Sequence, residues 1–344
     1  MTRRLFRPLP DRRRVASASI LAVFLFNGFG PGFADDLRTS VLNTFKTRPL
    51  AMGGAFTSVE DDLSALDFNP AAYRLGEGPE EIRVHAFINP GGPILLLGNA
   101  SRIDSWIPAL SGVVQGVGCA LGRFHGGIAF AGEMPAVRIR SNHPGFFDAR
   151  DFGRDSNTDF GFSFHLAPKV SLGAAGEMTV REGAWRRARF GYRYGIQLRP
   201  RADLSFGMCY FDFPKGNAAD RVLLERLADA TLNIGAAYAP AGWLRLALDV
   251  RNVSDEGKEV VREPHVGLEI VPLRHLAIES GYFRIRGDGG ETFSVGLCLL
   301  DQHAWIRPDR PHAGPRWVLR SALVESRSPA GRTRWVFLTG TLCL

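Results

Sequence analysis

The sequence lacks any long hydrophobic run after its first 34 residues. No later segment comes near 18 uninterrupted apolar residues, the length that a membrane-spanning helix needs. The chain has 344 residues, of which 45% are hydrophobic and 22% are charged, so it is not the kind of chain that stays disordered. A membrane-spanning helix after residue 34 and a disordered chain are therefore both excluded.

The chain also lacks the motifs of metal centres and hydrolases. Four cysteines lie far apart, with no CxxC pair: Cys119, Cys209, Cys298 and Cys343. Five of the eight histidines are scattered among the expected strands, with no HExxH and no paired spacing: His85, His125, His165, His265 and His275. No GxSxG elbow is present either. We therefore expect no enzyme, no catalytic residues, no metal and no cofactor.

Net positive charge is low outside the start of the chain, because acidic residues nearly balance the basic ones there. Residues 1–34 carry six Arg and one Asp, so they supply +5 of the total net charge of +7. This segment has a basic beginning, an apolar run from Val15 to Phe26, and small residues at Gly32 and Ala34. That is the pattern of a secretory signal peptide, with a retained membrane anchor as the alternative. The remaining chain, at +2, gives no reason to expect nucleic-acid binding.

What the sequence does have is alternation of polar and apolar residues. In residues 187–199, RARFGYRYGIQLR, one face carries Arg187, Arg189 and Arg193, and the other carries aromatic and aliphatic residues. Such period-two segments predict strands with two unlike faces. The pattern recurs in residues 160–166, 232–238, 244–250 and 293–299. Counting such segments from Ile82 to Leu344 gives about 14 strands.

Short and long connections alternate between these segments. We expect four prolines to lie in tight turns: Pro168, Pro200, Pro240 and Pro272. Longer polar connections lie between them, around residues 182–183, 214–229, 254–263 and 287–290, and residues 221–229 fit a short helix. One end of the sheet should therefore have short turns and the other longer loops, as in outer-membrane barrels.

Two architectures explain many strands with one apolar face. A soluble sandwich hides its apolar faces inside, whereas a barrel in lipid turns them outward around a polar lumen. The export signal, the unequal connections and the polar faces rich in Gly and Arg favour the barrel. We predict an all-β fold, an antiparallel transmembrane β-barrel of about 14 strands in contact with lipid of the cell outer membrane. A soluble secreted β-protein is the alternative.

Ahead of the strands stands TRPLAMGGAFTSVEDDLSALDFNPAAY, residues 47–73. This stretch resembles the N-terminal motif of the FadL-like outer-membrane proteins. That broad group contains long-chain fatty-acid transporters, PorV-type secretion barrels and UPF0164-type proteins. Three later segments resemble the C-terminal hairpins of the group: residues 231–253, 265–283 and 293–299.

The resemblance implies a small hatch, or plug, over residues 35–79, followed by the barrel over residues 80–344. The hatch motif consists of Gly53, Gly54, Asp61, Asp62, Asn69, Pro70 and Ala71. The glycines permit close backbone approach, and Asn69 is expected to cap a short helix that begins at Pro70. The two aspartates are expected to pair with lumen arginines. A purely structural role without contact to a substrate is the alternative for each of these residues.

The resemblance also implies passage of hydrophobic small molecules, such as long-chain fatty acids. A fatty acid needs an apolar groove for its tail and a cation for its carboxylate. Arg187, Arg189 and Arg193 form the predicted carboxylate-binding row, with a wet lumen that has no specific ligand as the alternative. The second function left open is a PorV-like barrel that binds or anchors an exported protein. We expect a monomeric barrel.

Overall fold

The computed structural model describes residues 38–42, 46–60, 62–74, 82–88, 113–132, 139–140, 143–144, 156–180, 188–212, 230–253, 262–273, 275–284, 290–299, 316–328 and 331–343. By its contacts the chain divides into two units, Met1–Leu37 and Arg38–Leu344, and all described residues belong to the second. The predicted signal peptide, the predicted domain boundaries at 34/35 and 79/80 and the predicted helix over 221–229 lie outside the described residues.

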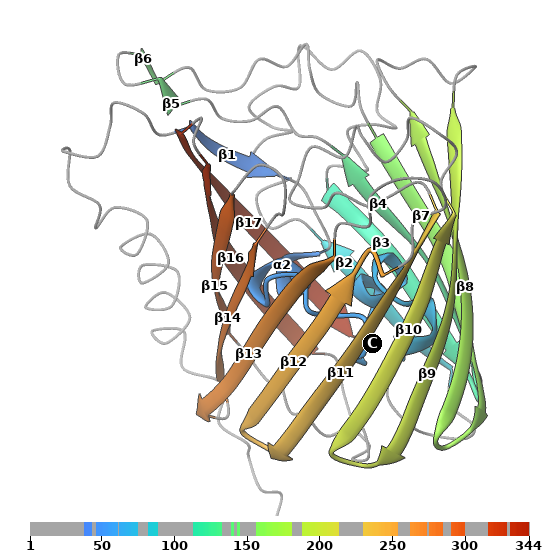
Figure 1. Ribbon diagram of the computed structural model, residues 1–344. Coiled ribbons are helices and arrows are strands. Elements are labelled where there is room, and N and C mark those ends of the chain that lie inside the picture. The colour runs from blue at the N-terminus through green and yellow to red at the C-terminus, as the bar shows by residue number, and fades with distance from the viewer. Residues whose placement is uncertain are drawn as a thin grey trace, which may run out of the picture. The chain divides into compact units, whose positions relative to one another are not determined.

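Fourteen strands form a closed antiparallel β-barrel (Figure 1). They are β2 (Arg83–Ile88), β3 (Val114–Leu121), β4 (Phe124–Gly132), β7 (Ser156–Ala167), β8 (Val170–Val180), β9 (Arg189–Arg201), β10 (Leu204–Asp212), β11 (Ala230–Ala241), β12 (Leu244–Arg251), β13 (Glu263–Leu273), β14 (Leu276–Arg284), β15 (Glu291–Leu299), β16 (Arg316–Ser328) and β17 (Gly331–Cys343). Each strand pairs with the next along the barrel, and β17 pairs back to β2. The prediction of an antiparallel barrel of about 14 strands is confirmed.

The alternation of side chains in β9 distinguishes the inner face of the barrel wall from its outer face. Arg193 and Gln197 point inward and are buried, whereas Tyr192 and Tyr194 point outward and are 45% and 53% exposed. Large apolar residues are exposed on the outside of most of the other strands as well. This is the reverse of a soluble sandwich, which hides its apolar faces. The outer face is the lipid-facing surface of a transmembrane β-barrel of the outer membrane.

The short connections gather at one end of the barrel, the lower end in Figure 1. Two-residue turns there join β3 to β4, β7 to β8, β9 to β10, β11 to β12 and β13 to β14. At the other end, longer stretches of sequence separate the end of each strand from the start of the next: β8 from β9, β10 from β11, β12 from β13 and β14 from β15. Two strand pairs depart from the predicted asymmetry. β15 ends and β16 begins at the short-turn end although they lie far apart in the sequence, whereas only two residues separate β16 from β17 at the other end.

Three of the four predicted turn prolines do not lie in turns. Pro168 does, but Pro200, Pro240 and Pro272 lie near the ends of β9, β11 and β13, beside register shifts that mark β-bulges. A bulge leaves one residue out of the ladder, so a residue without an N–H fits there. The residue before each of these prolines donates its N–H to the preceding turn instead: Arg199 to Lys169 O, Ala239 to Asp203 O and Val271 to Trp243 O, each at 2.8 Å.

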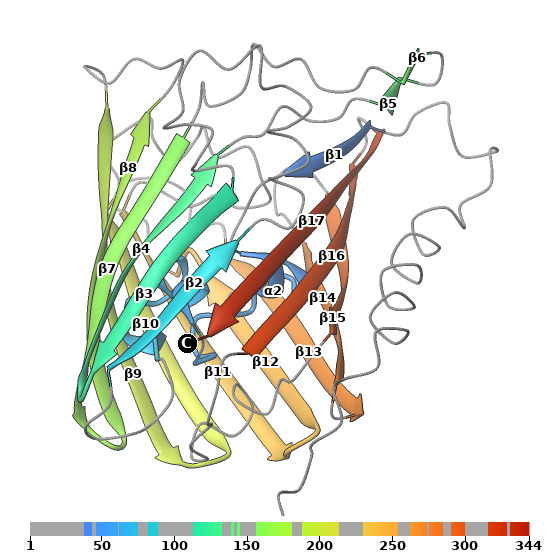
Figure 2. The same ribbon diagram turned by 180° about the vertical axis from the view of Figure 1, so that it is seen from behind.

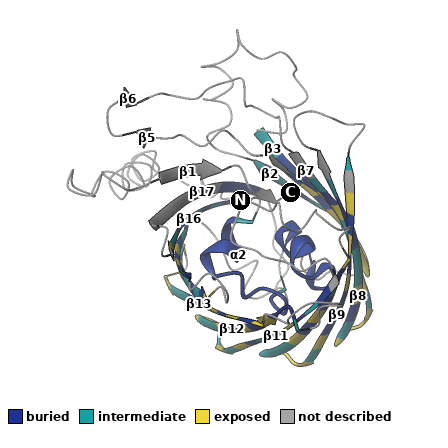
Figure 3. Ribbon diagram, turned by 45° about the horizontal axis from the view of Figure 1, so that its top comes forward, coloured by how far each residue is buried: buried dark blue, intermediate teal, exposed yellow. Residues whose placement is uncertain are grey.

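Residues 46–60 and 62–74, here called the inner segment, lie within the ring of strands (Figure 3). Their helical turns are α2 (Thr47–Ala51), η2 (Leu63–Asp67) and η3 (Pro70–Ala72). The α2 turn contacts β14 to β17, η2 contacts β3, β4 and β7, and η3 contacts β7 to β10. Nearly every residue of the inner segment is buried. Among the described residues, no helix is long and apolar enough to cross a membrane.

A further strand runs along the edge where the barrel closes. The strand β1 (Arg38–Leu42) pairs in parallel with residues 333–337 of β17, and β2 pairs with residues 340–343 on the same edge (Figure 2). A separate small sheet is formed by β5 (Ile139–Arg140) and β6 (His143–Pro144). The closing seam of the barrel is therefore shared by two short strands.

Candidate functional site

The two glycines of the hatch motif form a left-handed turn directly after α2. Gly53 has a φ of 62° and Gly54 a φ of 72°, a region of backbone conformation that favours glycine. Side chains of the wall contact the carbonyl oxygens of this turn. His265 Nδ1 lies 2.6 Å from Gly53 O, and Arg251 Nη2 donates to Gly54 O. Glycine is therefore favoured at both positions by the backbone conformation of the turn, and side chains of β12 and β13 hold the turn in place.

The wall has its own glycines where the inner segment approaches most closely. A Cβ added to Gly281 would overlap the backbone nitrogen of Gly53, and one added to Gly195 would overlap Asn69 Oδ1. At ten wall positions such a Cβ would lie 3.1 Å or less from an inner-segment atom: Gly116, Gly118, Gly127, Gly173, Gly195, Gly207, Gly235, Gly267, Gly281 and Gly296. The inner segment thus fits directly onto backbone, with no side-chain layer between them at these points.

Asn69 ties two parts of the inner segment to the wall. Its Oδ1 accepts from Ala71 N at 3.1 Å and so caps η3, in which Pro70 takes the first position. Its Nδ2 donates to Thr57 O at 2.8 Å and to Ile196 O at 3.2 Å. The predicted cap is confirmed. The same side chain also links the inner segment to β9.

The other motif residues have separate partners. Asp62 caps η2, accepting from Ser64 N at 3.0 Å, and its Oδ2 lies 3.7 Å from Arg320 Nη1. Ala71 O accepts from Ser171 Oγ at 2.7 Å. Asp61 lies outside the described residues. The described members of the motif are thus brought together along the inner segment, each facing a different part of the wall.

Arg193, a member of the predicted carboxylate-binding row, is fully buried and paired with protein carboxylates. Its Nη1 lies 2.6 Å from Asp159 Oδ1, and its Nη2 lies 2.7 Å from Asp67 Oδ1 and also contacts Glu177. The ligand atoms of these three carboxylates lie within 4.8 Å of one another, a spacing that suits a metal ion. The guanidinium supplies the positive charge among them instead, which is how a buried charge is normally compensated.

The side chains of the other two arginines of the predicted row lie outside the described part of the structure. Arg187 lies outside the described residues, and Arg189 is described only as a backbone position of β9. The role of these three arginines in binding a ligand carboxylate stays a prediction. For Arg193, the structure shows a charge already met by residues of the protein.

A second buried arginine, Arg48 of α2, was not singled out from the sequence. Its Nε and Nη2 bond both oxygens of Glu269 at 2.7 to 3.0 Å, and its Nε lies 3.7 Å from Glu279 Oε1. Arg245 Nη1 also reaches Glu269 Oε2, at 3.0 Å. Such a bidentate pair fixes geometry as well as charge. It joins the start of the inner segment to β13.

Two further contacts hold the middle and the end of the inner segment. Asp249 Oδ2 accepts from the backbone nitrogens of Phe56 and Thr57, both at 2.8 Å. Tyr73 donates its hydroxyl to Gly126 O at 3.1 Å, while its carbonyl accepts from Ser163 Oγ at 2.5 Å. Burial raises the pKa of the Tyr73 phenol well above its usual range, so the hydroxyl stays protonated and able to donate.

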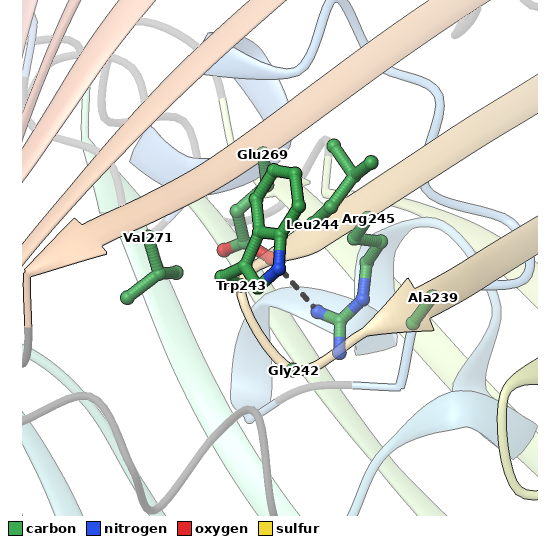
Figure 4. A pocket seen from close by; sticks show the side chains of 7 residues that line it. All are labelled: Ala239, Gly242, Trp243, Leu244, Arg245, Glu269 and Val271. Carbon is green, nitrogen blue, oxygen red and sulfur yellow. Dashed lines mark hydrogen bonds and ion pairs between the residues drawn. The ribbon is translucent and has the colours of Figure 1, made fainter.

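A small cavity lies at the short-turn end, beside the turn between β11 and β12 (Figure 4). The indole of Trp243 lies over the ion pair of Arg245 with Glu269, and Gly242 and Val271 complete much of the lining. Its volume of about 10 Å³ is the size of one water site. This cavity is therefore too small for a hydrocarbon.

The fold and the interior together define a class of protein. A closed 14-stranded antiparallel barrel carries apolar side chains outside and charged side chains inside, and a segment of its own chain occupies the interior. This is a transmembrane β-barrel with an internal segment packed in its lumen.

Comparisons with known proteins give similarity only at the level of solved structures. No protein-family model and no curated protein matches the chain. The toluene transporter TbuX of Ralstonia pickettii is 11% identical, with a TM-score of 0.47, over 87% of this chain and 97% of that one. The toluene transporter TodX of Pseudomonas putida is 10% identical, with a TM-score of 0.49, over 89% and 99%. A FadL homologue of Pseudomonas aeruginosa is 11% identical, with a TM-score of 0.45, over 88% and 97%. At these identities and TM-scores the likenesses assign no substrate.

Proposed function

We propose that this barrel admits hydrophobic compounds, such as long-chain fatty acids, across the outer membrane, and that the inner segment is its hatch. The observation that carries the proposal is how the inner segment is held. It contributes no strand to the barrel within residues 46–60 and 62–74, and side chains such as Arg48, Asn69 and Asp249 fasten it. It can therefore shift without breaking the ladder of backbone hydrogen bonds that lipid requires.

A barrel that binds or anchors an exported protein is the second candidate. The tight packing of the interior favours it, because Arg48 and Arg193 are both fully buried in ion pairs. The cavity beside Trp243 has room for one water site and not for a hydrocarbon chain. In this role the inner segment would stay in place permanently.

A reversible lock on the inner segment separates the two candidates. The Oγ1 atoms of Thr47, in α2, and Thr339, in β17, are in contact. Cysteines at these positions bring two sulfurs within bonding reach without a change in side-chain length. The double variant Thr47→Cys/Thr339→Cys is compared, oxidised and reduced, with the double variant Thr47→Ser/Thr339→Ser, which cannot form the bond.

The measurement is uptake of radiolabelled oleate and toluene by cells that lack their own outer-membrane transporter for such compounds. Barrel assembly is checked by heat-modifiable gel mobility. We expect uptake by the reduced form and a loss of about tenfold or more in the oxidised form. Equal uptake by both forms would show that α2 stays on β17 during uptake, so that any movement of the hatch is confined to its later residues, 62–74. An assembled barrel that takes up neither compound would contradict transport and favour the second candidate.

The predicted arginine row needs a separate test, because Arg193 also fastens the inner segment. The double variant Arg187→Ala/Arg189→Ala leaves Arg193 in its cluster with Asp67 and Asp159. If the row binds a carboxylate, oleate uptake should fall while toluene uptake is unchanged, because toluene has no charge. An equal change in both would argue against a carboxylate site at Arg187 and Arg189.

A further inference from the structure

Two histidines that lie far apart in the sequence come together at the short-turn end of the barrel, and a third lies on a strand nearby. The rings of His125, on β4, and His165, on β7, have centroids 4.6 Å apart and planes tilted by 44°. His85, on β2, pairs with Gly118 of β3, two residues from the residue that pairs with His125, but the ring nitrogens of the three histidines do not all lie within 4.8 Å of one another. In the sequence these histidines lie in separate segments without metal-binding spacing and predict no metal, because strand pairing is not visible there.

The strand register explains the meeting. His125 pairs directly with Ser163 of β7, so His165 stands two residues further along the same inward face. On the other side His125 pairs with Ala120 of β3, whose small side chain leaves space toward β2 and His85. His125 follows the turn between β3 and β4 and is buried, whereas His165 is partly exposed. The pair is thus fixed in position and accessible on one side.

The two rings are also held in orientation by the backbone. His125 hydrogen-bonds to the backbone of Gly122, and His165 to the backbone of Tyr73. His165 Nε2 lies 3.4 Å from Ser163 Oγ, and the Tyr73 ring stands edge-on to His125 with centroids 6.1 Å apart. A hydrogen bond from one ring nitrogen to a carbonyl is the usual support of a metal-binding histidine, because it fixes the tautomer and the direction of the ring.

We propose that His125 and His165 bind a divalent transition-metal ion, Zn²⁺ or Cu²⁺, and that His85 joins them by turning toward the ion. Imidazole nitrogens bind such ions at about 2.0–2.1 Å, whereas Mg²⁺ and Ca²⁺ prefer oxygen ligands. The neighbouring carboxylate, Glu60, is paired with Arg74 at 3.3 Å and with Arg199. The donor set is therefore imidazole, which selects zinc or copper.

Such an ion would tie β4 to β7 directly beneath the end of the inner segment. Tyr73 bonds to both strands, through Gly126 O on β4 and Ser163 Oγ on β7. Metal binding would hold these two partners at a fixed separation and so steady the last contact of the inner segment. This inference does not depend on what the barrel transports.

The test is calorimetric titration of the purified full-length barrel in detergent with Zn²⁺, and in parallel with Cu²⁺. We expect one ion per barrel, and a loss of affinity of about tenfold or more in the double variant His125→Ala/His165→Ala. His85→Ala should lower the affinity by less. The matched control is His275→Ala, because His275 is exposed and belongs to a different turn; its affinity should equal that of the native protein.

Equal Zn²⁺ affinity in the native protein and the double variant would overturn the proposal, as would the absence of any binding by the native protein. Because the double variant could assemble poorly, a second measurement uses the native protein alone. Zn²⁺ should raise its thermal unfolding midpoint, and EDTA should reverse the rise, since an ion that binds only the folded state stabilises it. No shift of the midpoint with either metal would contradict the site independently of any variant.

Discussion

The two buried arginines that fasten the inner segment come from opposite partners. Arg48 belongs to the inner segment, and its carboxylates, Glu269 and Glu279, belong to the wall. Arg193 belongs to the wall, and of its three carboxylates only Asp67 comes from the inner segment. In one anchor the cation, Arg48, belongs to the inner segment, which we propose to move. In the other the cation, Arg193, belongs to the wall of the barrel.

This difference has an energetic consequence. If the inner segment left the wall, Glu269 would keep Arg245 but lose Arg48, and Glu279 would lose Arg48, whereas Arg193 would keep both Asp159 and Glu177. A buried charge that loses its partner is costly, so the first anchor should resist release more strongly than the second. We infer that residues 62–74 separate from the wall more readily than residues 47–57.

The largest effect is expected from Arg48→Ala. The substitution leaves the bidentate partner Glu269 and its neighbour Glu279 buried without Arg48, which should lower the free energy of unfolding by about 3–5 kcal/mol. The measurement is urea unfolding of the purified barrel in detergent, followed by tryptophan fluorescence. The control Arg48→Met/Glu269→Gln removes both charges of the pair and should recover part of the loss. A loss below that of Asp67→Asn would reverse the ranking of the two anchors.

A smaller effect is expected from Asp67→Asn. Arg193 keeps Asp159 and Glu177, so its charge stays compensated, although Lys46 loses a partner at 2.5 Å. We expect a loss of about 1–3 kcal/mol in the same unfolding experiment. Asp159→Asn is the matched control, because it removes a carboxylate that stays with the wall. Faster proteolysis within residues 62–74 in Asp67→Asn, but not in Asp159→Asn, would locate the loosening in the inner segment.

Asn69→Ala should cost somewhat less, about 1–2 kcal/mol. The variant loses the cap on Ala71 N and the two hydrogen bonds that Nδ2 donates to Thr57 O and Ile196 O. Asn69→Asp retains an acceptor for the cap and loses the donors, so comparing the two variants separates the contributions. If both variants were as stable as the native protein, Asn69 would not be a tie between the inner segment and β9.

The smallest effect is expected at an ion pair outside the interior. Arg201 pairs with Asp203 at 2.7 Å in the turn between β9 and β10, but its side chain is 66% exposed. Arg201→Ala should change the free energy of unfolding by less than about 0.5 kcal/mol, because water screens such pairs. A loss as large as that of Asp67→Asn would show that burial does not explain the difference between the anchors.

The features that the sequence could predict are those set by local chemistry. Alternation fixes which residues of β9 face outward, because successive side chains of a strand point to opposite sides. Asn69 followed by Pro70 indicates a capped turn, because both residues act within one or two positions. The features that it could not predict join distant residues. Arg48 lies 221 positions from Glu269, and only the closing of the barrel brings them together.

The prolines show a different kind of limit. A proline near the end of a strand suits a turn and a bulge equally well, because neither position requires a backbone N–H donor. The register of the neighbouring strand decides between them, and this register is not visible in the sequence around Pro200, Pro240 or Pro272. The histidines at the short-turn end were missed for the same reason, since their meeting depends on which strands pair.

The ten wall glycines also determine what would remain if the inner segment were taken away. Removing residues 46–74 would not leave a smooth tube, because at Gly195, Gly281 and their counterparts the wall has no side chains to close the space. The inner surface of the barrel is complementary in shape to the inner segment, with gaps at the glycines where the segment's atoms lie. A segment from another protein would have to match the shape of this inner surface. The sequences of the wall and of the inner segment can therefore change only in a coordinated way.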